Sequence, residues 1–340
     1  MDVELANAQT VFRDLKTVSV KITNNSPDTQ KGVAKLSAPE GWSLAENEME
    51  YTVNGFETKL VDFEVTSKKQ VPFNMYSFGV QVVQSDGLEL FNKKVPLNFS
   101  VLVESSKEYR TENFDGDITD WQNAYPIYAG VPEDPDDMNQ WKESDVAAIA
   151  FLKYDKNNIY ILANVYDNIF HGKYTGTSMW RNDSLQMLLD PLNNGGDRPQ
   201  SDDIVFITGH TSAGKEFLKT LGPNGVTQTN NVPYENAITV IRDNSINQTR
   251  YLIKIPIDAV APLQISAGTK FRFNICFNDS DVEDRNNVVQ VTKGLLEGGT
   301  NRKPGLYYEF VMSGTDILGS TSPEDLRMDL TMKSDPLDFK

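Results

Sequence analysis

Apolar and polar residues alternate with a period of two along most of the chain. Clear examples are residues 17–23, 59–65 and 78–83. Successive side chains of a β-strand point to opposite faces, so this pattern predicts strands with one buried face. Asn, Gly, Pro and Asp cluster between the alternating runs, where they favour turns, and helical periodicity is scarce. The sequence therefore predicts an all-β fold built from β-sandwiches.

The strand pattern pauses at the polar run 104–112, which is the best domain boundary in the chain. We predict a first sandwich of six or seven strands over residues 1–104 and a larger sandwich over residues 113–313. The polar residues 314–340 form a tail, a linker or a last strand. Within the larger domain, strands are predicted at residues 146–154, 158–166, 183–190, 203–208, 237–242, 250–255, 270–278 and 306–312.

The length and the net charge of the chain exclude some classes of protein and partner. The chain has 340 residues, enough for two ordinary domains, with 39% hydrophobic residues and a net charge of −16. So acidic a surface repels phosphate, which argues against nucleic acid and anionic membranes as partners. No apolar run reaches the ~20 residues of a membrane span. The start of the sequence lacks a signal peptide, so either the protein is not exported or this is a piece of a longer exported chain. Its start inside strand-like sequence favours the second.

Several conspicuous residues are expected to be structural. Cys276 lies in an apolar strand and is expected to be buried, and as the single cysteine it forms no disulfide within the chain. Residues 209–216 have the spacing of a phosphate-binding loop, but Glu216 replaces the hydroxyl that would bind Mg²⁺, so a hairpin turn is predicted. Trp42 and Trp121 are expected to pack inward.

Three segments of the first domain carry a family resemblance, at residues 18–25, 36–42 and 76–80. The segment 39–42, Pro-Glu-Gly-Trp, is the most telling. The domain resembles the NPCBM-associated Ig-like domains, although residues 54–57 depart from their usual turn. This resemblance implies an Ig-like sandwich that acts as a spacer.

Four segments of the second domain carry another resemblance, in the same order as in the family: residues 114–121, 154–167, 180–190 and 267–279. The domain resembles the family 9 carbohydrate-binding modules, within the wider group of DOMON-like, jelly-roll sandwiches. This implies a non-catalytic module that binds an oligosaccharide or polysaccharide. It also implies a secreted or cell-surface location, as part of a larger carbohydrate-active protein.

The resemblance places Trp180 as one wall of a sugar slot. An indole face suits the apolar, electropositive C–H patches of a pyranose ring. Gln186 stands where the family often has a glutamate, and its amide can both donate and accept hydrogen bonds.

The rest of the slot departs from the family pattern. The second tryptophan is missing from residues 296–305, and the family's arginine is missing from residues 204–207. Trp141 and Tyr174, in neighbouring loops, are the candidates for a replacement wall.

A calcium site is expected from acidic turns. Asp115, Asp117 and Asp120 lie in one tight turn, and hard carboxylate oxygens at such spacing suit Ca²⁺. The resemblance also implies structural calcium. The alternative is a solvated acidic loop. A later loop carries three more carboxylates, Asp134, Asp136 and Asp137.

Catalysis is not expected. The only histidines, His171 and His210, lie in neither a triad nor a metal-binding pattern. Two other functions stay open. One is a structural or adhesive module that has lost its sugar slot. The other is a haem-binding electron-transfer domain, for which His171, Met179 and Met187 are the candidate ligands.

Overall fold

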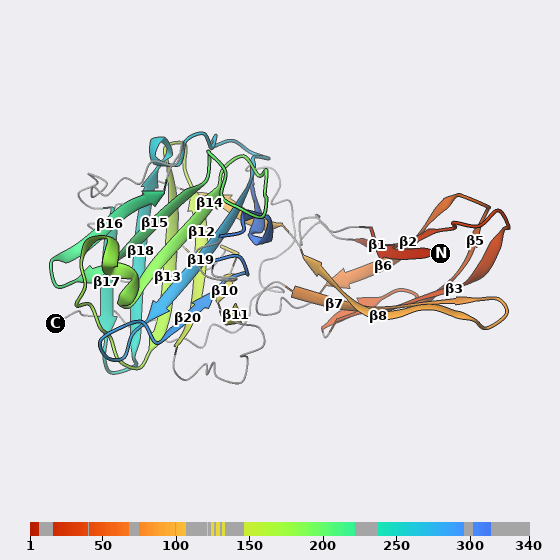
Figure 1. The fold of residues 1–340 in the computed structure, drawn as a ribbon, viewed down its shortest axis with the longest axis horizontal. Coiled ribbons are helices and arrows are strands. Elements are labelled where there is room, and N and C mark those ends of the chain that lie inside the picture. Colours follow the sequence, from red (N-terminus) through yellow and green to blue (C-terminus); the bar gives the residue numbers. More distant parts are fainter. Residues whose placement is uncertain are drawn as a thin grey trace. The chain divides into compact units, whose positions relative to one another are not determined.

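The computed structural model describes residues 1–6, 16–39, 41–67, 75–98, 100–106, 121, 124–125, 127–129, 131–132, 146–221, 237–295 and 302–313. Strands dominate these residues, and the helices among them are short 3-10 turns (Figure 1). The all-β prediction is confirmed. The chain divides into two compact units, one ending at Ser100 and the other beginning at Val101. In the described part of the chain, no helix is long and apolar enough to cross a membrane.

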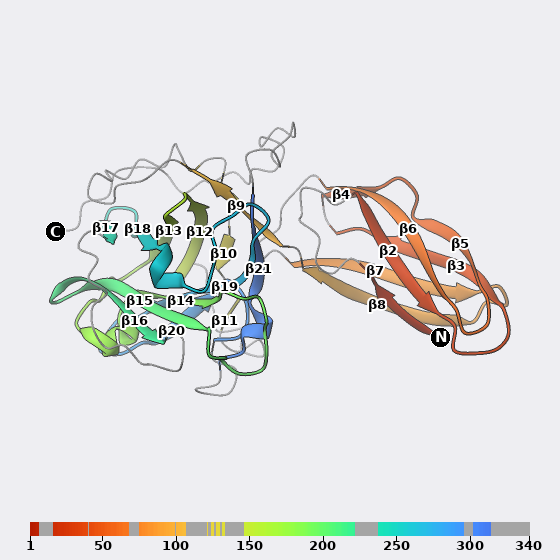
Figure 2. The ribbon, with the colours of Figure 1, turned by 90° about the horizontal axis from the view of Figure 1, so that it is seen from above.

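The first unit contains two four-stranded antiparallel sheets. The order in one sheet is β1-β2-β6-β4, and in the other β5-β3-β7-β8 (Figure 2). The strands are β1 (Asp2–Leu5), β2 (Thr17–Thr23), β3 (Gln30–Ser37), β4 (Trp42–Leu44), β5 (Glu48–Val53), β6 (Thr58–Ser67), β7 (Met75–Gln84) and β8 (Glu89–Asn98).

Aromatic rings join these two sheets. The ring of Trp42, on β4, lies with its centroid 5.0 Å from that of Tyr76 and 5.5 Å from that of Phe78, both on β7. Trp42 is buried, as expected. Because β4 and β7 belong to different sheets, the sheets pack face to face around these rings. The spacer role and the Ig-like assignment of this unit stay predictions.

The second unit is a larger set of strands in which sheet pairing follows the path β16-β15-β14-β19-β21-β9-β12-β13-β18-β17. The short strands β10, β11 and β20 lie off this path. The elements are β9 (Val101–Ser105), β10 (Ile127–Ala129), β11 (Val131–Pro132), β12 (Val146–Tyr154), β13 (Asn158–Asp167), η6 (Gly176–Arg181), β14 (Ser184–Asp190), β15 (Ile204–Thr211), β16 (Gly214–Leu221), β17 (Ile238–Asp243), β18 (Gln248–Pro256), η8 (Ile257–Val260), β19 (Lys270–Asp279), β20 (Asn287–Gln290), η9 (Pro304–Leu306) and β21 (Tyr308–Met312).

Strand β9 connects the two halves of this path. It runs parallel to β21 on one side and to β12 on the other. Residues 101–104, which the sequence pattern placed at the end of the first domain, therefore lie in the second unit. The predicted tail 314–340 and residues 107–112 of the boundary lie outside the described residues.

The local predictions within this unit can be compared strand by strand. The strand predicted at 146–154 matches β12, and the others fall within a few residues of the observed bounds. The last one begins later than predicted, because Pro304–Leu306 forms the turn η9. Residues 209–216 form the hairpin between β15 and β16, with Thr211 paired to Gly214. Trp121 and Cys276 are buried, as expected.

Candidate functional site

Trp180 lies at the surface, on the short helix η6 that leads into β14. Its neighbour Met179 is fully buried and packs against Ile207 and Leu218. This anchor fixes the turn, and Trp180 remains 41% exposed. The guanidinium carbon of Arg285 lies 5.2 Å from the centre of the Trp180 ring, a cation–π distance.

Gln186 lies on β14 and is connected to Trp180 through two further side chains. Its Nε2 donates a hydrogen bond of 3.1 Å to Asn278 Oδ1 on the neighbouring strand β19. Nη1 of Arg285 donates to the same oxygen at 3.2 Å. Gln186 is only 8% exposed. It therefore orients Asn278, and through Asn278 the guanidinium of Arg285, while the ring of Trp180 remains exposed.

Tyr174 holds the neighbouring loop, residues 281–286. Its hydroxyl donates to the backbone oxygen of Glu283, and the Arg181 guanidinium lies 4.0 Å from its ring centre. Arg181 in turn makes two hydrogen bonds, of 2.8 and 2.7 Å, with the carboxylate of Asp284. These bonds lower the pKa of Asp284. Tyr174 thus fixes the loop that carries Arg285. Trp141, the other candidate wall, lies outside the described residues.

Two members of this constellation, Asn278 and Arg285, were missed by sequence reasoning. The family's arginine is absent from residues 204–207, and Arg285 reaches Trp180 from a loop about a hundred residues further along the chain. The available signal was the polar run that follows β19. We name the group formed by Trp180, Gln186, Asn278 and Arg285 the Trp180 site.

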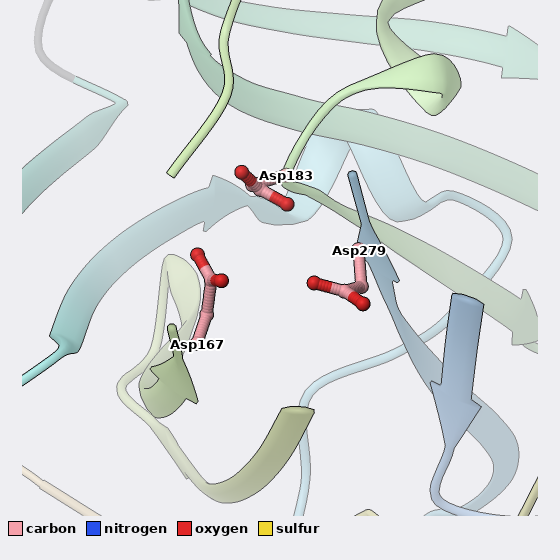
Figure 3. A group of neighbouring side chains, drawn as sticks. All are labelled: Asp167, Asp183 and Asp279. Carbon is pink, nitrogen blue, oxygen red and sulfur yellow. The ribbon is translucent and has the colours of Figure 1, made fainter. Parts of the chain in front are cut away.

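A cluster of three buried aspartates lies at the start of β14, the end of the strand that follows Trp180. Asp167, Asp183 and Asp279 each place a carboxylate oxygen within 4.8 Å of the others. Figure 3 shows the three carboxylates converging on one space from different segments. Arg242 reaches this cluster as a buried cation, with its Nη1 3.3 Å from Asp167 Oδ2. We name this group the Asp183 cluster.

Burial controls the ionisation of the Asp183 cluster. Asp183 accepts hydrogen bonds from the backbone N–H groups of His171 and Ser280, which favour its charged form. Burial and the charge of Asp167 act in the opposite direction more strongly, and raise the pKa of Asp183 to about 9. A protonated Asp183 together with Arg242 therefore relieves much of the repulsion between these carboxylates.

A second buried cluster lies at the other end of β14. Asp190, Asp202 and Asp203 also place carboxylate oxygens within 4.8 Å of one another. Burial raises the pKa of Asp203 to about 7, and the charges of Asp190 and Asp202 act in the same direction. We name this group the Asp190 cluster.

The oxygen atoms and charges of the two clusters can be compared with what a bound Ca²⁺ requires. Both consist of carboxylate oxygens, which suit Ca²⁺. The Asp183 cluster already contains a cation, Arg242. In the Asp190 cluster, Asp202 Oδ2 and Asp203 Oδ1 are buried and have no hydrogen-bond partner among the described residues. The second cluster therefore fits a cation better. The predicted site at Asp115, Asp117 and Asp120 lies outside the described residues.

The structure places the three candidate haem ligands in different environments. Nδ1 of His171 lies 3.3 Å from the hydroxyl oxygen of Ser280. Met179 belongs to the apolar cluster described above, and Met187 is fully buried in the middle of β14.

Comparison with known proteins gives the family. The model of the carbohydrate family 9 binding domain-like family matches residues 115–294. No curated protein matches the chain. A family 9 carbohydrate-binding module from Caldicellulosiruptor kristjanssonii in complex with cellotriose has 18% identity and a TM-score of 0.45, over 66% of this chain and 98% of that one. The structure of such a module from the same organism with glucose has 17% identity and a TM-score of 0.45, over 65% and 100%. Because the matched residues make up more than half of the chain, it belongs to the carbohydrate family 9 binding domain-like family.

Proposed function

We propose that this chain binds a sugar at the Trp180 site and catalyses no reaction. The observation that carries the proposal is the ring of Trp180, 41% exposed on a turn that its buried neighbour holds in place. Large apolar side chains are normally buried, and an exposed, fixed indole ring beside hydrogen-bonding groups is suited to a ligand with apolar C–H faces and hydroxyls.

The neighbours of Trp180 provide the polar part of the site. Arg285 lies over the ring and can donate to sugar hydroxyls, while its guanidinium donates to Asn278, which Gln186 in turn orients. With Arg285 at one face of the ring, the sugar would stack on a single indole face. The loss of a second aromatic wall forfeits about 1 kcal/mol, so binding is expected in the millimolar to high-micromolar range.

The surroundings of the module belong to the same proposal. The first unit would act as an Ig-like spacer, and both units would be parts of a larger secreted or cell-surface protein that acts on carbohydrate. The family of the second unit supports this.

The test is calorimetric titration of the full chain with a panel of monosaccharides and oligosaccharides. Trp180→Ala should abolish measurable binding and leave the far-ultraviolet circular dichroism unchanged. Phe56→Ala is the matched control, because Phe56 is an aromatic residue of the first unit that is 72% exposed. Binding that survives in Trp180→Ala would refute the proposed site.

A second candidate is a structural or adhesive module without sugar affinity. The observation in its favour is that Arg285, rather than an aromatic ring, lies against Trp180. The absence of binding across the whole panel at millimolar sugar, with the chain folded, would establish this candidate instead.

A further inference from the structure

An Asn-Gly pair lies on an exposed turn of the first unit. Asn54 and Gly55 connect β5 to β6, and the backbone N–H of Glu57 donates to the Asn54 oxygen at 3.2 Å, which closes a β-turn. Phe56 has a positive φ of 61°, as the third residue of a type II turn requires. Asn54 is exposed. Its side-chain amide is therefore open to water and stands next to a residue that has no side chain.

The backbone nitrogen of Gly55 is accessible to the Asn54 side chain. Among the described residues, no hydrogen bond joins the Gly55 N–H to a partner. Asn54 Nδ2 donates to Glu57 Oε2 at 3.0 Å, so the amide bends toward the residues that follow it, the direction in which the Gly55 nitrogen lies. Because Gly55 has no Cβ, no side chain shields its nitrogen from Cγ of Asn54.

A second Asn-Gly pair, in the second unit, has the opposite surroundings. Gly195 is buried, and its N–H donates at 2.8 Å to Asp190 Oδ2. Asn194 Nδ2 donates at 3.1 Å to Asp202 Oδ1. The glycine nitrogen and the asparagine amide of this pair are thus both held by carboxylates. A third pair, at residues 224–225, lies outside the described residues.

We infer that its turn makes Asn54 a site of spontaneous deamidation, a covalent modification that consumes water. Asparagine is among the thermolabile residues. The Gly55 nitrogen would attack Cγ of Asn54, so that a bond between nitrogen and Cγ forms and the bond from Cγ to Nδ2 breaks. Ammonia leaves with the proton of the Gly55 N–H, and a cyclic imide remains. Water then opens this ring at either carbonyl carbon and gives aspartate or isoaspartate.

The products do not fit the turn as asparagine does. Both carry a carboxylate where Asn54 donates to Glu57, so two like charges would face each other. Isoaspartate also adds a backbone carbon to a turn without space for one, since a Cβ on Gly55 would lie 2.0 Å from the Pro27 oxygen. The Asn54 backbone oxygen accepts from Nδ2 of the buried Asn24 at 3.0 Å. The modification should therefore destabilise the first unit.

The test follows the full chain in a mildly alkaline buffer below its unfolding temperature, by peptide mapping with tandem mass spectrometry at successive times. Asn54 should be converted to an acid at least tenfold faster than Asn194. In urea, where both pairs are unfolded, the two rates should agree to within a few-fold. Equal rates in the folded chain, or a difference that persists in urea, would overturn the inference.

Asn54→Gln is the matched variant, because it keeps the amide but would have to close a larger ring, which forms far more slowly. An enzyme that methylates isoaspartate should label the aged wild-type chain several-fold more than the aged variant. The urea midpoint of the first unit should fall with the converted fraction in the wild-type chain and stay constant in Asn54→Gln. Equal labelling of the two aged chains would place the reaction elsewhere and overturn the assignment to Asn54.

Discussion

The two ends of strand β14 carry buried aspartate triads of the same composition, and they balance their charge differently. The Asp183 cluster, at the start of the strand, contains Arg242, whose side chain is 3% exposed and pairs with Asp167. The Asp190 cluster, at the end of the strand, has two carboxylate oxygens without hydrogen-bond partners in the described residues. One triad thus contains its own cation, whereas no basic side chain forms an ion pair with the other triad in the part of the chain that the structure describes.

This difference teaches that a count of acidic residues does not identify a metal site. What distinguishes the two triads, among the described residues, is whether a basic side chain forms an ion pair with one of the carboxylates, as Arg242 does with Asp167. The same test separates Asp202 and Asp203 from the exposed Asp284, whose carboxylate is saturated by Arg181.

The largest effect should come from removing the internal cation of the Asp183 cluster. Arg242→Met leaves Asp167 and its neighbours buried without their guanidinium, and such a loss costs about 3–5 kcal/mol. Arg272→Met, beside the Asp190 cluster, removes two long hydrogen bonds to backbone oxygens and should cost about 1 kcal/mol. Urea titration, fitted with one transition for each unit, measures both. Equal losses for the two variants would remove the contrast between the clusters.

The next effect is the dependence of stability on pH. Burial raises the pKa of Asp183 to about 9 and that of Asp203 to about 7. A carboxyl whose pKa is raised on folding keeps its proton in the folded chain at pH values where the unfolded chain has lost it. Its contribution to the free energy of unfolding therefore falls as pH rises above about 4, and is constant above the folded pKa.

Between pH 7 and 9, in EDTA, Asp183 should dominate this fall, with at most about 1.4 kcal/mol per pH unit. Added calcium should flatten the curve below pH 7, because a cation at the Asp190 cluster would displace the proton of Asp203, and should leave the upper window unchanged. Urea titrations across pH 5–10 measure both windows. Flattening that extends up to pH 9 would instead place the cation at the Asp183 cluster, because Asp183 keeps its proton over that whole range.

The smallest effect should come from the amide oxygen of Asn193, in the loop between Asp190 and Asp202, which is buried with no hydrogen-bond partner among the described residues. Asn193 has a positive φ of 55°, so glycine can replace it without backbone strain. Asn193→Gly should weaken calcium binding several-fold and change stability in EDTA by less than about 1 kcal/mol. Asn244→Gly is the matched control at the other cluster, where Asn244 accepts a hydrogen bond from Arg242. Calorimetric calcium titration decides, and equal affinity in both variants would show that the Asn193 amide oxygen does not contribute to calcium binding.

The alternating pattern predicted most strands because it depends on local burial alone. Strand β12 was predicted with its observed bounds, and β13, β14 and β19 to within one residue. Strand β9 shows that the alternating pattern does not contain information about sheet partners. Its residues Val101 to Glu104 are all buried, so they do not alternate, and local sequence gives no indication of which unit supplies their partners.

The candidate sites depend even more on contacts between distant residues. Trp180 and Gln186 could be named because they lie in one short segment that resembles the family. Asn278 is 92 residues away from Gln186, and only the pairing of β14 with β19 makes them neighbours. The same holds for the Asp183 cluster, whose members lie on three separate segments. The calcium prediction used only the local spacing of Asp115, Asp117 and Asp120, so it could not identify the Asp183 cluster.

The position of β9 has a consequence for how the second unit folds. This strand, at the beginning of the unit, pairs with β21 at its end, and the Ser313 hydroxyl donates to the Val103 carbonyl across 210 residues of sequence. Contacts of such separation slow folding, because a long loop must close before they form. On the ribosome, β9 would have to wait for nearly the whole unit to be synthesised before its partner β21 emerges, and it would meanwhile present an unpaired strand edge to chaperones or to other chains.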